Sequence, residues 1–181
     1  MSSLCHIHQN RIVHRDIKPD NLLISSQTAT LKLADFGLSK QLFIPHHPLS
    51  PQVQTLWYRA PELILGDRGY SFSVDIWAAG CVFFEMLTGR ILFANSSEIG
   101  ILFDMFKLLG TPTIQDWPEL QGMDHFKASF PKFPTSDLRK KLGVIQDQLA
   151  IDLLSQIIKL NPAERPTAQQ CLQHPYFLGI D

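Results

Sequence analysis

Residues 14–25 read HRDIKPDNLLIS, a segment that places charged and polar groups directly before a short β-prone run. A second β-prone run, TLKLAD at residues 30–35, follows after a polar connection. The two runs predict a small β-hairpin. Asp16 and Asn21 precede the first strand and Asp35 ends the second, so a tight hairpin should return Asp35 close to Asn21.

These side chains have the chemistry of a site that handles phosphate. Carboxylate and amide oxygens are the hard ligands that Mg²⁺ takes together with waters and phosphate oxygens. Lys18 lies two residues after Asp16 in an extended segment, so both side chains should point the same way. A carboxylate beside a cation can accept a proton from an incoming hydroxyl while the cation stabilises a transferring anion.

The chain after residue 72 has the pattern of a helical domain. Residues 73–89, SVDIWAAGCVFFEMLTG, are apolar nearly all the way round, begin at a candidate Ser cap and end at Gly89. They predict a buried central helix with a left-handed C-cap. Residues 97–110 repeat the arrangement, with Ser97 as the cap and a glycine as the stop. Two further helices are expected, within residues 143–160 and 167–177.

Other segments have weaker patterns. Residues 41–56 lack periodicity and contain three prolines, so they predict a loop. In the helix expected within residues 143–160, the apolar positions are 149, 153, 154, 157 and 158.

The amino-acid composition limits the classes of protein to which this chain can belong. The 181 residues are 45% hydrophobic and 18% charged, which indicates a globular chain long enough for one core. The formal net charge is −1 and the longest basic run is RKK at 139–141, which argues against nucleic acid or an anionic membrane as a partner. Cys5, Cys81 and Cys171 fit neither a disulfide framework nor a zinc pattern. With no apolar signal segment, we expect an intracellular protein of the cytoplasm or nucleus.

Three motifs carry a resemblance to a known family. Asp16-x-Lys18-Pro19-x-Asn21, Asp35-Phe36-Gly37 and Ala60-Pro61-Glu62 resemble the catalytic-loop, DFG and APE motifs of eukaryotic protein kinases, in the same order and spacing. DIWAAG at 75–80 and NPAERPT around residue 165 match the same family. The alternative is that the first two motifs are chance charged turns on a helical domain.

The resemblance implies a fold and a set of boundaries. Residues 1–181 would form a partial protein kinase domain: a mainly α C-terminal lobe with a small β-hairpin at the catalytic cleft and the N-terminal lobe absent. The expected parts are the catalytic loop 14–21, the DFG segment 35–37, the activation segment 35–62 and the helical subdomain 63–181. Neither a G-x-G-x-x-G loop nor a Val-Ala-Ile-Lys strand occurs in the sequence.

The resemblance also implies the roles of the residues in the cleft. Asp16 would be the base that orients and deprotonates the substrate hydroxyl, and Lys18 would contact the γ-phosphoryl of ATP. Asn21 and Asp35 would hold Mg²⁺. Leu23 would form the floor of the adenine pocket. ATP and Mg²⁺ are therefore the expected cofactors.

Further matching residues would hold the site together. His14 and Phe36 resemble stacked residues of a hydrophobic spine, and Asp75 resembles the anchor that caps the backbone of the catalytic loop. Glu62 and Arg165 should form a buried ion pair, and removing one partner should cost on the order of 3–5 kcal/mol.

The sequence between residues 55 and 66, TLWYRAPELILG, is similar to cyclin-dependent and mitogen-activated kinases, most closely the former. Lys18 in HRDIKPDN resembles serine/threonine kinases. Thr55 resembles the threonine that braces the catalytic aspartate and lysine; the alternative is an ordinary loop hydroxyl. Val53 and Arg59 would contact substrate, and Arg59 accompanies a preference for Ser/Thr followed by Pro.

Ser50 falls where cyclin-dependent kinases carry their activating phosphothreonine. A phosphate there could pair with Arg15 and Lys40 and order the loop. Lys40 stands where an arginine is usual and binds phosphate less rigidly. Ser50-Pro51 could itself be a proline-directed target, or Ser50 could be an unmodified loop serine.

Two functions from different classes follow. The first is a serine/threonine protein kinase acting on protein substrates, with a cyclin or other activating subunit as a partner. The second is a non-catalytic kinase-lobe module that binds proteins, because a glycine-rich loop and its lysine are needed for efficient phosphoryl transfer. A metal-dependent nuclease could use the same carboxylates, but the charge balance and the downstream motifs argue against it.

Overall fold

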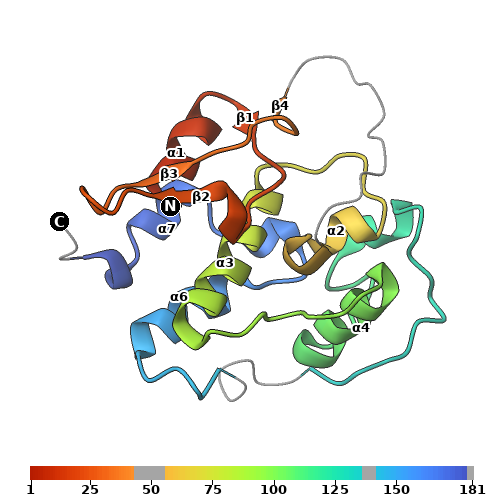
Figure 1. The fold of residues 1–181 in the computed structure, drawn as a ribbon. Coiled ribbons are helices and arrows are strands. Elements are labelled where there is room, and N and C mark those ends of the chain that lie inside the picture. Colours follow the sequence, from red (N-terminus) through yellow and green to blue (C-terminus); the bar gives the residue numbers. More distant parts are fainter. Residues whose placement is uncertain (43–55, 136–141, 179–181) are drawn as a thin grey trace.

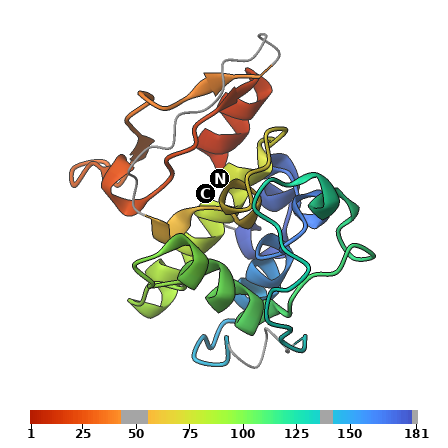
Figure 2. The same cartoon turned by 90° about the vertical axis from the view of Figure 1, so that its right-hand side faces the viewer.

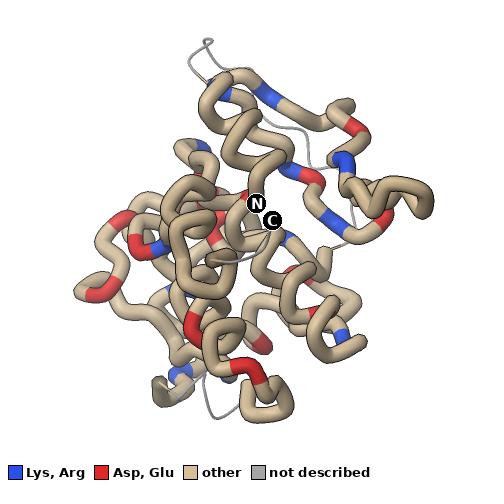
Figure 3. The backbone as a smooth tube through the Cα atoms, turned by 90° about the vertical axis from the view of Figure 1, so that its left-hand side faces the viewer, with Lys and Arg blue, Asp and Glu red and all other residues tan. Residues whose placement is uncertain are grey.

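The computed structural model describes residues 1–42, 56–135 and 142–178. The described part is mainly helical, with two small antiparallel sheets (Figure 1). Acidic and basic residues are interspersed along the chain, in keeping with the net charge of −1 (Figure 3). Within these residues, no helix combines the length and the apolar character that crossing a membrane requires.

The first 42 residues contain the four strands that the structure describes. The elements are α1 (Ser2–Gln9), β1 (Ile12–Val13), η1 (Pro19–Asn21), β2 (Leu22–Ile24), β3 (Leu31–Leu33) and β4 (Lys40–Gln41). Strand β2 pairs with β3 with Leu22 opposite Leu33, so the predicted hairpin is confirmed. Strand β1 pairs with β4. Both views show this red to orange part gathered at one end of the molecule (Figures 1 and 2).

The rest of the described chain is helical. Its elements are η2 (Leu56–Tyr58), α2 (Pro61–Ile64), α3 (Ser73–Thr88), α4 (Glu98–Leu109), η3 (Pro118–Gly122), α6 (Gln148–Ile157), η4 (Pro162–Glu164), α7 (Ala168–Leu172) and η5 (Pro175–Phe177). Helix α3 runs through the middle, with α6 beside it (Figure 1). Helix α1 packs on α7, which ties the N-terminal segment to the C-terminal one.

Helix α3 forms over the predicted residues and ends at Gly89, whose φ of 66° is the left-handed conformation expected of a C-cap. The prediction of Ser73 as its cap is wrong, because Phe72 takes the N-cap position. The Ser73 hydroxyl instead lies 2.9 Å from the Ser71 hydroxyl and 3.5 Å from Glu62 Oε1. The polar group at the start of this helix is therefore used for tertiary contacts.

Helices α4, α6 and α7 begin at side-chain caps. The Ser97 hydroxyl accepts a hydrogen bond from the Gly100 N–H at 3.1 Å, as predicted for α4. Helix α6 begins only at Gln148, because Asp147 caps the N–H groups of Leu149 and Ala150. Leu149, the first apolar position of the predicted helix, lies in this first turn and is 46% exposed. The remaining apolar positions of that set, 153, 154, 157 and 158, are buried.

Close contact between α3 and α6 explains one glycine of the central helix. A Cβ added at Gly80 would meet Ile157 Cγ2 and would lie 2.9 Å from Ile158 Cδ1. Only a glycine therefore lets the two helices approach this closely. Trp77 of the same helix stacks on Phe93 with 5.7 Å between ring centroids, and both are fully buried.

The predicted loop at 41–56 is described only at its ends. Gln41 belongs to β4 and Leu56 begins η2, while residues 43–55 lie outside the described residues. The three cysteines are free thiols, in agreement with the prediction that they form no disulfide framework.

Candidate active site

The segment 14–16 is held by a carboxylate from the central helix. Asp75 lies in the first turn of α3 and is buried. Its Oδ2 accepts the backbone N–H of His14 and its Oδ1 accepts that of Arg15, each at 2.8 Å. These bonds fix the backbone beside Asp16. They also support the left-handed conformation of Arg15, whose φ of 70° is unfavourable for a residue with a side chain.

Asp16, Lys18 and Asn21 converge on one carboxylate. Lys18 Nζ lies 2.9 Å from Asp16 Oδ2. Asn21 Nδ2 donates to the same oxygen at 3.0 Å and to the Asp16 carbonyl at 2.8 Å. Among the described residues no bond reaches Asp16 Oδ1. One carboxylate oxygen is therefore held by two donors, while the other is available to accept a proton.

His14 connects this segment to the end of the hairpin. Its Nδ1 accepts the Asp16 N–H at 3.3 Å, and its Nε2 lies 3.0 Å from the Ala34 carbonyl. Because a carbonyl can only accept, Nε2 carries the proton and the ring is the neutral Nε2–H tautomer. The rings of His14 and Phe36 contact each other edge to face, with centroids 4.8 Å apart at 67°. That geometry suits the aromatic quadrupole.

Asp35 and Asn21 lie at the base of the hairpin. The Ala34 N–H donates to the Asn21 carbonyl at 2.9 Å, so Asp35 follows a residue bonded directly to Asn21. Asp35 has a φ of 60°, and its Oδ1 accepts the Gly37 N–H at 3.2 Å. Asp35 and Arg15 thus both adopt the left-handed region.

The donor set at the base of the hairpin suits Mg²⁺. The amide nitrogen of Asn21 is used by Asp16, so its Oδ1 remains an oxygen ligand. The exposed Asp35 carboxylate is a second one. Within the described residues no group of three or more His, Cys, Asp or Glu is arranged to hold a metal. An amide and one carboxylate fit a cation that takes its other ligands from phosphate and water.

The hairpin exposes apolar side chains. Leu23 is 57% exposed and Ile24 is 69% exposed. Leu31 on β3 and Phe36 after it are also exposed. The residue expected to form the floor of an adenine pocket therefore lies on an open apolar surface.

A pocket adjoins Asp16 on the side of η2 and α2. It is lined by Arg15, Asp16, Ile17, Tyr58, Arg59, Ala60, Leu63, Val74 and Ala78. Arg59 forms an ion pair with Glu98 of α4. The Tyr58 hydroxyl donates to Glu85 Oε2 at 2.7 Å, and burial, with help from that carboxylate, raises the pKa of Tyr58 well above its usual range. These contacts fix the wall of the pocket opposite Asp16.

The remaining predicted residues divide into described and undescribed ones. Arg15 donates from Nε to the Leu38 carbonyl at 2.6 Å and from Nη1 to the Tyr70 hydroxyl at 3.0 Å. Lys40 lies in β4 opposite Val13 of β1. The predicted residues Ser50, Val53 and Thr55 lie outside the described residues.

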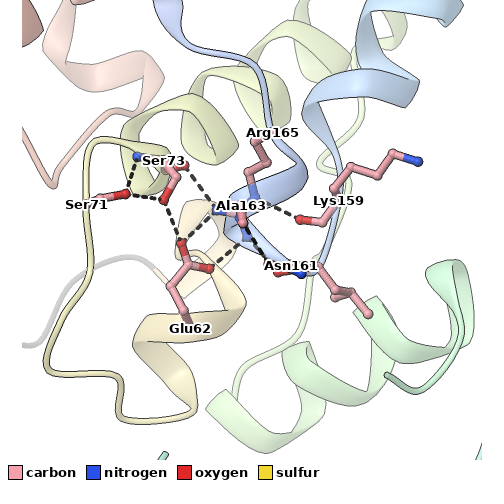
Figure 4. Close-up of polar contacts among 8 residues, drawn as sticks. Glu62, Ser71, Ser73, Lys159, Asn161, Ala163 and Arg165 are labelled. Atoms are coloured by element: carbon pink, nitrogen blue, oxygen red, sulfur yellow. Dashed lines mark hydrogen bonds and ion pairs between the residues drawn. The ribbon is translucent and has the colours of Figure 1, made fainter. Parts of the chain in front are cut away.

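The ion pair expected between Glu62 and Arg165 is present and fully buried (Figure 4). Arg165 Nη1 and Nη2 donate to the two carboxylate oxygens at 2.7 and 2.8 Å. The other three N–H groups reach the carbonyls of Lys159, Ser73 and Leu160 at 2.8, 3.1 and 2.9 Å. Every donor of this guanidinium is therefore satisfied.

Two residues with contacts in the site were not predicted from the sequence. His8 Nε2 lies 2.9 Å from Asp75 Oδ2, and Tyr70 binds the Arg15 side chain. A signal for His8 was its place four residues after the apolar Leu4, which is buried on the same face of α1. Tyr70 has no such signal, because its contact depends on how the turn before α3 folds.

Comparison with known families agrees with this geometry. The model of the family described as "Protein kinase domain" matches residues 1–177. The matched range contains the Asp16 cluster, the hairpin base and the Glu62–Arg165 pair. Protein kinases are phosphotransferases that use ATP and a divalent metal ion. The chain belongs to the protein kinase domain family.

Proposed function

We propose that this chain is the C-terminal lobe of a serine/threonine protein kinase similar to cyclin-dependent kinases. It transfers the γ-phosphoryl group of ATP to Ser or Thr followed by Pro in protein substrates. The segments 14–21, 35–37 and 35–62 serve as catalytic loop, DFG segment and activation segment, and residues 63–181 form the helical subdomain.

One observation carries the proposal: the asymmetric contacts of the Asp16 carboxylate. Lys18 and Asn21 occupy Oδ2, and Oδ1 carries no bond within the described residues. In the proposed reaction Oδ1 accepts the proton of the substrate hydroxyl. Lys18 then stabilises charge on the transferring group, because an ammonium held against the base is positioned before the reaction begins.

Asn21 and Asp35 would hold Mg²⁺ through Oδ1 and a carboxylate oxygen, and Leu23 would lie under the adenine of ATP. Bound Mg²⁺ would neutralise charge on the phosphates. The chain's own part is to keep the Asn21 oxygen available, which it does by committing the amide nitrogen to Asp16.

Substrate preference follows from the sequence resemblance. Arg59 and Val53 would shape the site for the residue after the phosphorylated one, and Thr55 would brace Asp16 and Lys18. Asp16 and Arg59 line the same small pocket, which supports a place for Arg59 beside the catalytic aspartate. Phosphorylation of Ser50, bound by Arg15 and Lys40, would order the activation segment.

Partners and location complete the proposal. Protein substrates and a cyclin or other activating subunit are the proposed partners, in the cytoplasm or nucleus. The exposed apolar residues of the hairpin, with Ile24 at 69%, support a second lobe or subunit covering this surface. The same surface favours the alternative of a kinase lobe that binds proteins without catalysis.

Nucleotide titration separates the two functions. ATP is titrated into the chain with and without Mg²⁺ by calorimetry, and we expect weak, Mg²⁺-dependent binding that Asp35→Asn abolishes. Asp67→Asn, a carboxylate in the turn after α2, is the matched control and should bind as the wild type does. Absence of binding at millimolar ATP would favour the protein-binding alternative.

Transfer is then measured on the chain joined to a kinase N-terminal lobe that supplies the glycine-rich loop and its lysine. Asp16→Asn should lower the rate by about 10²–10⁴-fold, because the proton acceptor is lost. Nucleotide affinity should stay near that of the wild type. Asp20→Asn, an exposed carboxylate in the same loop, is the control. Turnover by Asp16→Asn equal to that of the control would refute the assignment of Asp16.

A further inference from the structure

A second cavity, of about 540 Å³, shares no lining residue with the pocket beside Asp16. Two segments that are distant in sequence form its walls. One is the end of α4 with the turn that leads to Trp117, and the other is the last turn of α6 with residues between 158 and 164. A space of this volume accommodates a ligand the size of a short peptide.

Hydrogen bonds within the chain hold these walls together. Asn161 Nδ2 donates to the Asp116 carbonyl at 3.1 Å, which joins one wall to the other. The buried Arg165 donates to the carbonyls of Lys159 and Leu160 at 2.8 and 2.9 Å and so anchors the second wall from the core. The cavity is therefore formed by the fold itself, and little ordering of the chain opposes binding.

The indole of Trp117 is an unused donor in this cavity. Trp117 lines the cavity, is only 1% exposed and belongs to the hydrophobic core. No hydrogen bond among the described residues satisfies its N–H, and, in contrast to the Trp77 nitrogen, the Trp117 nitrogen is not fully enclosed. A buried donor without an acceptor is costly, so a ligand that offers a carbonyl oxygen at this place gains a hydrogen bond.

The charged groups on the walls favour a cation. The walls carry the carboxylates of Asp116 and Glu164 and the ammonium of Lys159. Within the described residues none of the three forms an ion pair. The Lys159 side chain points away from Arg165, whose Nε binds its carbonyl (Figure 4). The last turn of α6 adds the partial negative charge of a helix C-terminus, so the cavity is negative overall.

We propose that this cavity binds a peptide segment of a partner protein in which a basic side chain lies next to an apolar one. The basic side chain pairs with Glu164 and Asp116. The apolar side chain packs against the half-buried Leu109 and Pro112. A backbone carbonyl of the peptide accepts the Trp117 indole N–H. The inference goes beyond the proposed catalytic function and does not depend on it, because no residue of the Asp16 site takes part.

The test titrates blocked peptides into the full chain by calorimetry. The probe is the pentapeptide Ala-Leu-Arg-Leu-Ala, for which we expect saturable binding. Its counterpart with Gln in place of Arg should bind about tenfold more weakly, because both carboxylates lose their partner. Absence of saturable binding at millimolar peptide would overturn the proposal, and so would equal affinities of the two peptides.

A variant of the cavity locates the site. Glu164→Gln should weaken binding of the Arg peptide about fivefold, the loss expected for one ion pair at a partly open site. The same variant should bind the Gln peptide as the wild type does, which completes a double-mutant cycle. Glu119→Gln is the matched control, because Glu119 is an exposed carboxylate on η3 that does not line the cavity. An equal affinity of the Arg peptide for Glu164→Gln and wild type would refute binding in this cavity.

A measurement on the wild type needs no variant. The ¹⁵N–¹H signal of the Trp117 indole should shift with the Arg peptide and saturate at the concentration that calorimetry gives. A signal that stays in place at saturation would contradict a peptide carbonyl at Trp117. Arginine amide is the probe for a free cation, and we expect it to bind at least tenfold more weakly than the peptide, since it lacks the apolar neighbour. Equal affinities would assign the cavity to a small cation and overturn the peptide as its ligand.

Discussion

Two arginines of this chain, Arg165 and Arg15, differ in how completely their charges are satisfied. Arg165 donates all five N–H groups, two of them to a buried carboxylate, and its guanidinium lies 4.9 Å from the centroid of the Trp77 ring. Arg15 donates two, both to neutral oxygens. Arg165 therefore has no unused donor and serves a structural contact. Arg15 has three N–H groups without an acceptor among the described residues.

The same contrast separates the regions that hold these arginines. Around α3 and α6, large apolar side chains such as Trp77 and Leu154 are completely buried. On the hairpin, Leu23 and Ile24 are more than half exposed. The helical region is therefore a packed core, whereas the hairpin keeps large apolar side chains on its surface.

The largest effect should come from breaking the buried ion pair between Glu62 and Arg165. Arg165→Met keeps most of the side-chain volume but leaves the Glu62 carboxylate buried without its partner. We expect the free energy of unfolding to fall by about 3–5 kcal/mol, because the remaining charge loses its compensation in a dry interior. Urea denaturation followed by circular dichroism measures the change.

An exposed pair provides the control for this prediction. Arg68 Nη2 lies 2.7 Å from Asp124 Oδ2, but the Arg68 side chain is 87% exposed. Arg68→Met should cost about 0–1 kcal/mol, since solvent screens this pair. Similar losses of stability in the two variants would contradict the expectation that burial decides how much each ion pair contributes.

Local sequence rules predicted much of the fold and part of the site. The hairpin, the C-cap at Gly89 and the cap at Ser97 depend on turn and capping preferences of a few neighbouring residues, and all three are present. The start of α6 was placed less well, because a single side chain, Asp147, decides where that helix begins. The convergence of Lys18 and Asn21 on Asp16 also followed from short sequence separations.

Contacts between distant segments could not be predicted in the same way. Tyr70 and Arg15 are 55 residues apart, and His8 and Asp75 are 67 residues apart. Neither pair leaves a pattern in the sequence, because each depends on the direction of a turn or on helix packing. The exposure of Leu149 is a case of the opposite kind, in which an apolar residue fits the helical period but falls in an open first turn.

A smaller effect should separate the packed core from the open hairpin. Leu154→Ala removes a side chain with no exposed surface, so we expect a loss of about 2–5 kcal/mol from transfer and cavity terms. Leu23→Ala removes the same atoms from an exposed position and should change stability by less than about 0.5 kcal/mol. Denaturation of the isolated chain measures both. A loss at Leu23 comparable to that at Leu154 would mean that the hairpin surface is already covered in solution.

The smallest effect should be a loss of stability at alkaline pH. It is expected because two cysteine thiols are buried in the helical region. Burial raises the pKa of Cys171 to about 11 from an ordinary value of 9.0, and burial also raises the pKa of Cys81. Because a raised pKa means that the folded state keeps its proton longer, this contribution is fully present below pH 9.0 and is lost as the pH rises toward about 11. Above pH 9.0 the unfolded chain releases protons that the folded chain retains, so the free energy of unfolding should fall.

Urea denaturation at several pH values measures how steeply the free energy of unfolding falls with pH, and Cys171→Ala should make this fall less steep. The difference in stability between the two chains at pH 7 reports packing alone. If the free energy of unfolding fell equally with pH in both chains, the α1–α7 contact would open to solvent before the chain unfolds. Cys171 would then belong to the exposed part of the molecule and not to the packed core.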